Sequence, residues 1–391
     1  MRYRVLAAMS LAIVMASWVP VPSAGALASR SLTSVWFSIP TQGYGSVIQT
    51  DLSSNGASET CTDYIGRTSD GGRRFQNFTK IRTWNCTNAE DATALTFDHA
   101  GDGFFYDPNL YETHNAGATW IRVRTHGRVV AISAVGRSVW MIEAQCTAQE
   151  VSRNAKCPLK MLQSSDGGRT WSDPVALPGS SFEYPAAATE TAVVQTILTR
   201  LDERRAVYSI SPIVSGDVSG DRVQTWVTND SGLRWMRRDI VCTIPTISEM
   251  LAISPSGVWT AICAGQPAAG SQAKAVMRST DQGRTWKFVI GCSTSKSPCD
   301  GPLTAGYLGV LSAPSGSLLI ESGLRSSLNV SDDGGRTWRS INGAVSDSGD
   351  GAVSLQFFNS HQGLGLTSSS NLIIRTVDGG VKWQTYRAGV G

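Results

Sequence analysis

Ser331-Asp332-Asp333-Gly334-Gly335-Arg336-Thr337-Trp338 is the stretch that decides the fold of this 391-residue chain, because its pattern recurs. The pattern is Ser/Thr-x-Asp-x-Gly-x-x-Trp, which we call the repeat motif. Five copies keep it in full, whereas one earlier copy ends in Phe75 and another carries Asn115 in place of Asp. The acidic or amide positions of the seven copies are Asp70, Asn115, Asp166, Asp230, Asp281, Asp333 and Asp378.

The spacing of the motif predicts the architecture. Successive copies lie between 45 and 64 residues apart, and a recurrence of this length is typical of repeat folds such as propellers. Short runs rich in Val, Ile, Leu, Phe and Thr fill each interval, separated by Gly, Pro and Ser, as in strands joined by turns. The sequence therefore predicts an all-β, seven-bladed β-propeller, with four antiparallel strands per blade and one motif hairpin in each.

The residue types of the motif suit a tight turn. Asp and Asn side chains accept hydrogen bonds from backbone N–H groups two residues on, and Gly adopts the positive φ that a reversal needs. The closing Trp gives the next strand a large apolar anchor. We therefore interpret Asp333, Arg336, Trp338 and their counterparts in the other copies as structural residues.

In these seven motifs the chain resembles the Asp-box, or BNR-repeat, β-propellers, and the resemblance covers everything after the first 28 residues. That family includes sialidases, sortilin receptors, xyloglucan-cleaving glucanases and the photosystem II assembly factor. The resemblance implies that each motif is the hairpin between the third and fourth strands of a blade. It also implies two classes of function, namely a binding or assembly role and glycoside hydrolysis.

The first 28 residues are expected to be a secretory signal peptide. Basic residues precede an apolar run from Val5 to Trp18, and small residues offer cleavage points after Ala26 or Ala28. An uncleaved membrane anchor is the alternative, although the run is shorter than a full membrane span. We expect a secreted or otherwise extracytoplasmic protein whose residues 29–391 form a single propeller. The expected blades span about 33–83, 84–126, 127–178, 179–241, 242–291, 292–343 and 344–391.

Charge and composition argue against several partner classes. The chain has 34 basic and 31 acidic residues, and the leader holds Arg2 and Arg4 but no acidic residue, so the mature charge is about +1. So small a charge favours neither nucleic acid nor an anionic membrane surface as a partner. No P-loop or dinucleotide motif occurs, so no cofactor is expected. No CxxC occurs, so no metal is expected, and we expect a monomer.

The eight cysteines predict four disulfide bonds, because an even count in an exported chain indicates a disulfide framework. Pairing nearest neighbours keeps each bridge within or beside one blade, although the sequence leaves the connectivity open. Loops of a propeller blade alternate between the two faces of the ring, and all the cysteines map to the face opposite the motifs. We call this the disulfide face, and the other the motif face. The cysteines are Cys61, Cys86, Cys146, Cys157, Cys242, Cys263, Cys292 and Cys299.

We expect function on the disulfide face, where the longest insertions also map. These run from Ser172 to about Glu190 and from Ser211 to Asp221, around blade four. Disulfide bonds would hold such loops in place, unless the bridges serve stability alone. Aromatic and carboxylate side chains there would suit a carbohydrate or a peptide. The candidate ligand-binding residues are Trp84, Phe182, Glu183, Tyr184, Asp217, Asp221, Gln266 and Asp300.

The sequence argues against catalysis. The resemblance implies an Arg in the Phe/Tyr-Arg-Ile-Pro motif of sialidases, but Phe37-Ser38-Ile39-Pro40 has Ser38 there, which cannot make a bidentate bond to a carboxylate. A two-carboxylate glycosidase needs its acids about 5–10 Å apart, and no pair can be assigned. We therefore expect no catalytic residues and a propeller that binds a protein partner or glycan on the disulfide face. The alternative is a secreted glycoside hydrolase, for which the available acids are Glu143, Glu183, Glu249 and Glu321.

Overall fold

The computed structural model describes most of the chain from residue 29 onward, and the expected leader lies outside the described residues. Four candidate ligand-binding residues and two cysteines also lie outside them, namely Tyr184, Asp217, Asp221, Asp300, Cys146 and Cys299. No helix in the described part is long and apolar enough to cross a membrane. The described residues are 29–52, 59–86, 94–98, 100–106, 109–145, 156–179, 182–183, 195–211, 224–246, 248–268, 270–292, 303, 306–324, 328–341, 351–369 and 371–391.

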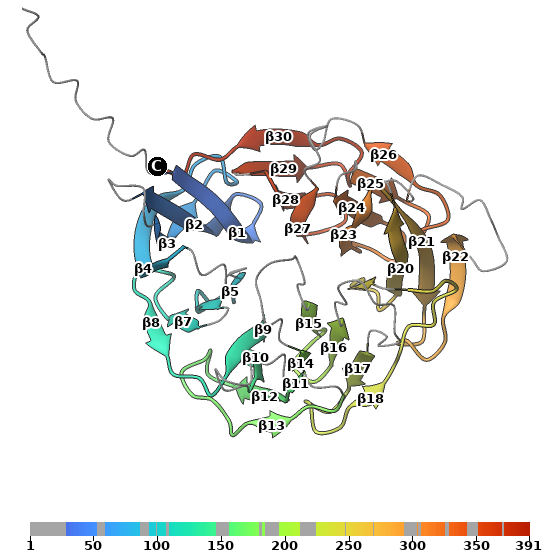
Figure 1. Ribbon diagram of the computed structural model, residues 1–391, viewed down its shortest axis with the longest axis horizontal. Coiled ribbons are helices and arrows are strands. Elements are labelled where there is room, and N and C mark those ends of the chain that lie inside the picture. The colour runs from blue at the N-terminus through green and yellow to red at the C-terminus, as the bar shows by residue number, and fades with distance from the viewer. Residues whose placement is uncertain are drawn as a thin grey trace, which may run out of the picture.

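Seven four-stranded antiparallel sheets stand around a ring, which confirms the expected seven-bladed, all-β fold (Figure 1). In each sheet the strands follow sequence order from the centre of the ring outward. Blades one to three hold β1 (Ser29–Ile39), β2 (Gln42–Leu52), β3 (Glu59–Thr68), β4 (Gln76–Asn85); β5 (Ala94–Phe97), β6 (Gly103–Tyr106), β7 (Leu110–Thr113), β8 (Ile121–Val123); β9 (Arg128–Val135), β10 (Ser138–Ala144), β12 (Leu159–Ser164), β13 (Val175–Ala176).

The remaining blades follow the same plan, and one small extra sheet stands apart from them. Blades four and five hold β15 (Gln195–Arg200), β16 (Ala206–Ser211), β17 (Gln224–Thr228), β18 (Met236–Arg237); β19 (Ser248–Ile253), β20 (Trp259–Ala268), β21 (Ser271–Ser279), β22 (Lys287–Gly291). Blades six and seven hold β23 (Tyr307–Ser312), β24 (Leu319–Leu324), β25 (Leu328–Ser331), β26 (Arg339–Ile341); β27 (Ala352–Phe357), β28 (Gly363–Thr367), β29 (Leu372–Thr376), β30 (Gln384–Arg387). The two-stranded extra sheet pairs β11 (Lys156–Cys157) with β14 (Phe182–Glu183).

Blade one is longer than expected at both ends. β1 begins at Ser29 rather than near residue 33, and β4 continues to Asn85 instead of ending at residue 83. Trp84 pairs with Cys61 across β3 and β4. Trp84 therefore belongs to the outer strand of blade one rather than to the start of blade two.

Every copy of the repeat motif forms the turn between the third and fourth strands of its blade. The Ser or Thr hydroxyl donates to the Asp or Asn Oδ1 two residues on, at 2.7–3.0 Å. The same hydroxyl accepts the N–H of the motif glycine. The motif glycine lies two residues after the Asp or Asn, so its N–H is already bonded to the hydroxyl. Oδ1 therefore accepts the N–H four residues on, and not the N–H two residues on that the sequence predicted.

The motif turns gather on one face of the ring. In six blades, the residue after the motif Asp or Asn donates its N–H to a carbonyl in the turn between the first and second strands, at 2.8–3.1 Å. In blade six, for example, Gly334 donates to Ser317 O at 2.8 Å. Both kinds of turn therefore lie on the motif face, and the connections between second and third strands or between blades lie on the disulfide face.

Each blade buries both of its sheet faces against its neighbours. In β10, Val139 and Met141 pack against Phe104 of blade two, whereas Trp140 packs against Tyr208 of blade four. Successive side chains of a strand point to opposite faces of the sheet, so both alternating sets are apolar here. The core is therefore a ring of layers between blades rather than one central cluster.

Blades seven and one close the ring without exchanging a strand, since each takes its four strands from one continuous segment. The C-terminal residues lie along the first motif instead: Phe75 N–H donates to Gly389 O at 2.8 Å, and Gly389 N–H donates to Arg73 O at 2.8 Å. Nearer the centre, Leu32 N–H donates to Asn371 Oδ1 at 2.6 Å, across 339 positions of sequence. Hydrogen bonds to the backbone therefore join the two ends of the chain.

Candidate functional site

Two disulfide bonds lie on the disulfide face within the described part of the chain. Cys61–Cys86 joins the start of β3 to the residue after β4, with Cα atoms 5.3 Å apart. Cys242–Cys263 joins the connection after blade four to β20 of blade five, with Cα atoms 6.0 Å apart. Each bridge joins neighbouring cysteines within or beside one blade, which confirms disulfide bonding for these two pairs.

A buried charge pair stabilises the disulfide face between blades five and six. Lys274 Nζ lies 3.6 Å from Glu321 Oε1 and donates to Leu303 O at 2.7 Å, in the connection between these blades. Asn329 Nδ2 donates to Glu321 Oε2 at 2.7 Å. Burial raises the pKa of Glu321 and lowers the pKa of Lys274, and the attraction between the two charges partly opposes both shifts. Glu321 therefore has a structural role in this arrangement.

The other described acids of the hydrolase alternative are also buried and scattered. Glu143 in β10 of blade three is 0% exposed, and burial raises the pKa of its carboxyl group. Glu249 in β19 of blade five is 7% exposed, and its Oε1 lies 3.1 Å from Cys242 Sγ. Neither lines a pocket described below, and nor does Glu321. The described parts of these pockets therefore offer no pair of carboxylates for glycoside hydrolysis.

The candidate ligand-binding residues that the structure describes belong to separate parts of the ring. Trp84 is half-buried in blade one, with the Arg82 guanidinium 5.5 Å from its ring centroid. Gln266 is exposed in β20 of blade five, beside an irregularity in the pairing of β20 with β21. Phe182 and Glu183 form β14, which pairs with β11 between blades three and four, and their side chains lie outside the described part. Their role in binding stays a prediction.

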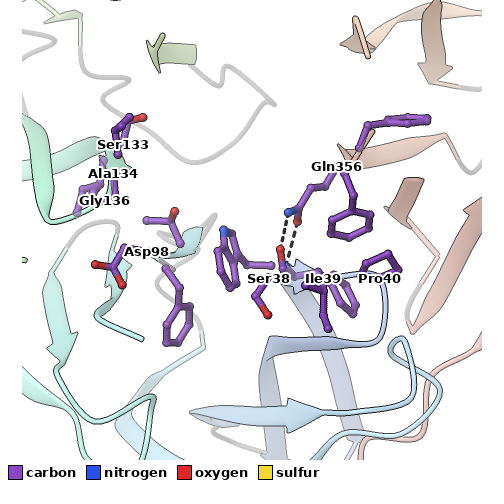
Figure 2. A pocket seen from close by; sticks show the side chains of 16 residues that line it. Ser38, Ile39, Pro40, Asp98, Ser133, Ala134, Gly136 and Gln356 are labelled. Atoms are coloured by element: carbon purple, nitrogen blue, oxygen red, sulfur yellow. Dashed lines mark hydrogen bonds between the residues drawn. The ribbon is translucent and has the colours of Figure 1, made fainter. Parts of the chain in front are cut away.

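A cavity of about 620 Å³ opens at the centre of the ring, and we call it the central hollow (Figure 2). It is lined by residues at the carboxyl ends of β1, β5, β9 and β27, the inner strands of blades one, two, three and seven. The turns between first and second strands begin there, so the hollow opens on the motif face. Its aromatic lining residues are Trp36, Phe37, Phe97, Phe357 and Phe358.

Polar groups in the central hollow are few and already oriented. Gln356 accepts Phe37 N–H at 3.0 Å and donates to Phe37 O at 2.6 Å, as the dashed lines in Figure 2 show. Asp98, which is the only ionisable residue among the described residues of the lining, accepts the N–H groups of Ala100 and Asp102 at 2.8 and 2.9 Å. Burial raises the pKa of Asp98 despite these hydrogen bonds. Asp98 therefore closes the turn between β5 and β6, and the described part of the lining holds no arginine.

A second cavity of about 320 Å³ lies beside the central hollow in blade one, and Ser38 lines both. We call it the lateral hollow. Arg67 and Arg74 line it, together with the amide side chains of Gln42, Gln76 and Asn77. Its position beside the first motif puts it on the motif face as well.

Sequence reasoning missed both hollows because it followed the cysteines and the long loops. One signal was present in the first motif, which has Phe75 where the others have Trp and carries two adjacent arginines, Arg73 and Arg74. Departures from a repeat often mark positions with a role of their own. For the central hollow there was no comparable signal, because its lining comes from four blades.

No family model and no curated protein matches the chain. Among solved structures, YCF48 bound to D1 peptide has a TM-score of 0.54 at 18% identity, covering 90% of this chain and 94% of that one. Pyrococcus horikoshii acylaminoacyl peptidase has a TM-score of 0.51 at 8% identity, covering 92% of this chain and 52% of that one. A Hadza microbial sialidase has a TM-score of 0.40 at 15% identity, covering 84% and 73%. At these identities the similarity shows the fold alone.

Proposed function

We propose that this protein is an exported, non-catalytic Asp-box propeller that binds a protein partner or a glycan. The observation that carries the proposal is the central hollow, whose described lining combines aromatic and polar side chains and has Asp98 as its only ionisable residue. Glycoside hydrolysis needs a second carboxylate or an equivalent nucleophile at a defined distance. A preformed concave site that combines apolar side chains with a few oriented polar groups is typical of binding sites.

We also propose the motif face as the binding surface, in place of the disulfide face expected from the sequence. A solved propeller of similar fold, YCF48, holds a D1 peptide, which supports a binding role for such a ring. The identical hydrogen bonding of the seven motif turns supports the Asp-box assignment. Two disulfide bonds support an oxidising compartment, and a signal peptide over residues 1–28 and a monomeric state stay part of the proposal.

The proposal is tested with two matched tryptophan variants on arrays of peptides and glycans. Ser133→Trp fills the central hollow from β9, whereas Gln266→Trp adds the same bulk to the disulfide face. We expect Ser133→Trp to lose at least about tenfold in array binding and Gln266→Trp to bind as wild type, because only the former blocks the hollow. The reverse result would return the binding surface to the disulfide face. Release of the aryl group from any of a panel of aryl glycosides would refute the proposal that the protein is non-catalytic.

A further inference from the structure

In the first repeat motif, the residue four positions after the motif Asp is a cation, whereas in three other motifs this residue is a Thr that bonds the turn. In blades three, five and six, a Thr four residues after the motif Asp donates its hydroxyl to that Asp at 2.6 Å. Blade four has Arg234 there, with its Nε 3.7 Å from Asp230 Oδ2. Blade one has Arg74, which is exposed, and its guanidinium has no partner among the described residues. The first motif therefore presents an unpaired positive charge on the motif face.

Among the described residues, Arg74 and Arg67 are the only charged ones that line the lateral hollow. Asp70 is close in sequence but is not part of the lining, and its Oδ1 accepts the Thr68 hydroxyl at 2.9 Å and the Arg74 N–H at 3.0 Å. Asp70 therefore serves the turn. A cavity with two guanidinium groups and no carboxylate in its lining attracts anions.

Arg67 is held in position at the border of blades one and two. Its Nη2 donates to Ala116 O, and its Cζ lies 5.7 Å from the ring centroid of Tyr44. Tyr44 is fixed in turn, because its hydroxyl donates to Ala116 O at 3.1 Å and its ring stacks on Phe97 at 3.8 Å. A guanidinium fixed in this way loses little conformational freedom when it binds a carboxylate.

An irregular stretch of β4 adds amide groups to the hollow. The pairing of β3 with β4 shifts between Ile65 and Arg67, and Asn77 has a φ of 53°, a conformation that residues other than glycine adopt uncommonly. Irregularities of this kind redirect side chains and occur often beside binding sites. Gln76 and Asn77 line the hollow at this point, and their amides can donate to and accept from hydroxyl groups.

We propose that the lateral hollow binds the carboxylate of an acidic sugar, so that the glycan that this propeller holds carries uronate residues. The two arginines would bind the carboxylate, and the amides of Gln42, Gln76 and Asn77 would bind the sugar hydroxyls. Ser38 lines both cavities, so a chain of sugars can continue from the lateral hollow into the central hollow. The inference rests on the proposed binding function and names its ligand class.

The test is calorimetric titration of the purified protein with trigalacturonate and with its carboxyl-reduced, neutral counterpart. Arg74→Gln removes one charge from an exposed position, and Arg234→Gln is the matched control at the same motif position in blade four. Because the variant loses a charge-assisted hydrogen bond to the carboxylate, we expect Arg74→Gln to weaken trigalacturonate binding about tenfold or more. Arg234→Gln should bind as wild type, the neutral sugar should bind at least about tenfold more weakly, and added salt should weaken uronate binding.

Several results would overturn the inference. These are equal binding of the acidic and neutral sugars, an equal loss in Arg74→Gln and Arg234→Gln, and no binding of trigalacturonate at all. Binding of an Asp- and Glu-rich peptide in place of the sugar would assign the hollow to a different ligand class and would also refute it. The array result for Ser133→Trp decides the proposed function separately, because Ser133 lines the central hollow and not the lateral one.

Discussion

The disulfide face and the motif face of the ring hold their loops by different means. On the disulfide face, Cys61–Cys86, Cys242–Cys263 and the buried Lys274 connect segments that lie 21 to 29 residues apart. On the motif face, each turn is closed within a few residues by a hydroxyl, a carboxylate and backbone N–H groups. The central hollow lies at the ends of the inner strands on this face, and the lateral hollow lies beside the first motif. Among the described residues, the two hollows therefore lie on the motif face and the cross-links on the disulfide face.

The largest effect is expected for Lys274→Met on the disulfide face. The change leaves Glu321, which is 0% exposed, without its buried counter-charge, and it leaves Leu303 O without its donor. Losing one partner of a buried pair costs about 3–5 kcal/mol, and we expect that loss in the free energy of unfolding, measured with guanidinium chloride. The double variant Lys274→Met/Glu321→Leu should recover much of it. A loss below about 1 kcal/mol in Lys274→Met would show that this buried charge pair does not stabilise the disulfide face.

The next effect is expected for Cys242→Ala/Cys263→Ala. The bridge closes a segment with a sequence separation of 21, and a loop of that size corresponds to about 3 kcal/mol of stability. Denaturant unfolding of the oxidised double variant should show that loss. Adding a reductant should lower the stability of wild type. It should lower the stability of the variant by less, because the variant lacks this bridge. Equal stability of wild type and variant under oxidising conditions would contradict the prediction.

A smaller effect is expected for Asp333→Ala on the motif face. Asp333 Oδ1 accepts the N–H groups of Arg336 and Thr337, both at 2.9 Å, and the change leaves these donors to water. Together these two hydrogen bonds contribute about 1–2 kcal/mol to the free energy of unfolding, because water can replace them in an exposed turn. Asp333→Asn should lose less than half as much, because in the blade-two turn Asn115 Oδ1 still accepts the Thr113 hydroxyl and the Thr119 N–H. Equal losses in the two variants would show that the charge, and not the acceptor, closes the turn.

The smallest effect is a pH dependence of the motif face. Burial raises the pKa of Asp333, but hydrogen bonds from Thr337 and Ser331 outweigh it and lower the pKa to about 2. A carboxyl whose folded pKa lies below its unfolded value stabilises the fold above the unfolded pKa, and this stabilisation is lost as pH falls through the folded pKa. Wild type should thus lose stability relative to Asp333→Asn between about pH 4 and pH 2. Parallel curves for the two proteins in denaturant unfolding at several pH values would contradict this.

The parts of the molecule that depend on local sequence could be predicted. Thr68, Asp70 and Gly72 close their turn within four positions, and the same holds for every other copy. Counting the copies therefore predicted the number of blades. The ring closure could not be predicted, because Asn371 contacts Leu32 across 339 positions of sequence. No pattern in either segment indicates that the two segments meet.

The sequence by itself determined the blade number, the strand order and the face on which the described cysteines lie, since each follows from turns and alternation within one repeat. The three-dimensional arrangement determined where the cavities are. Ser38, Asp98, Ser133 and Gln356 come from four different blades, and they meet only because the ring closes with blades one, two, three and seven around its centre (Figure 2). A hollow formed by the ends of separate strands has no local sequence pattern, so its position depends on the packing of whole blades against each other.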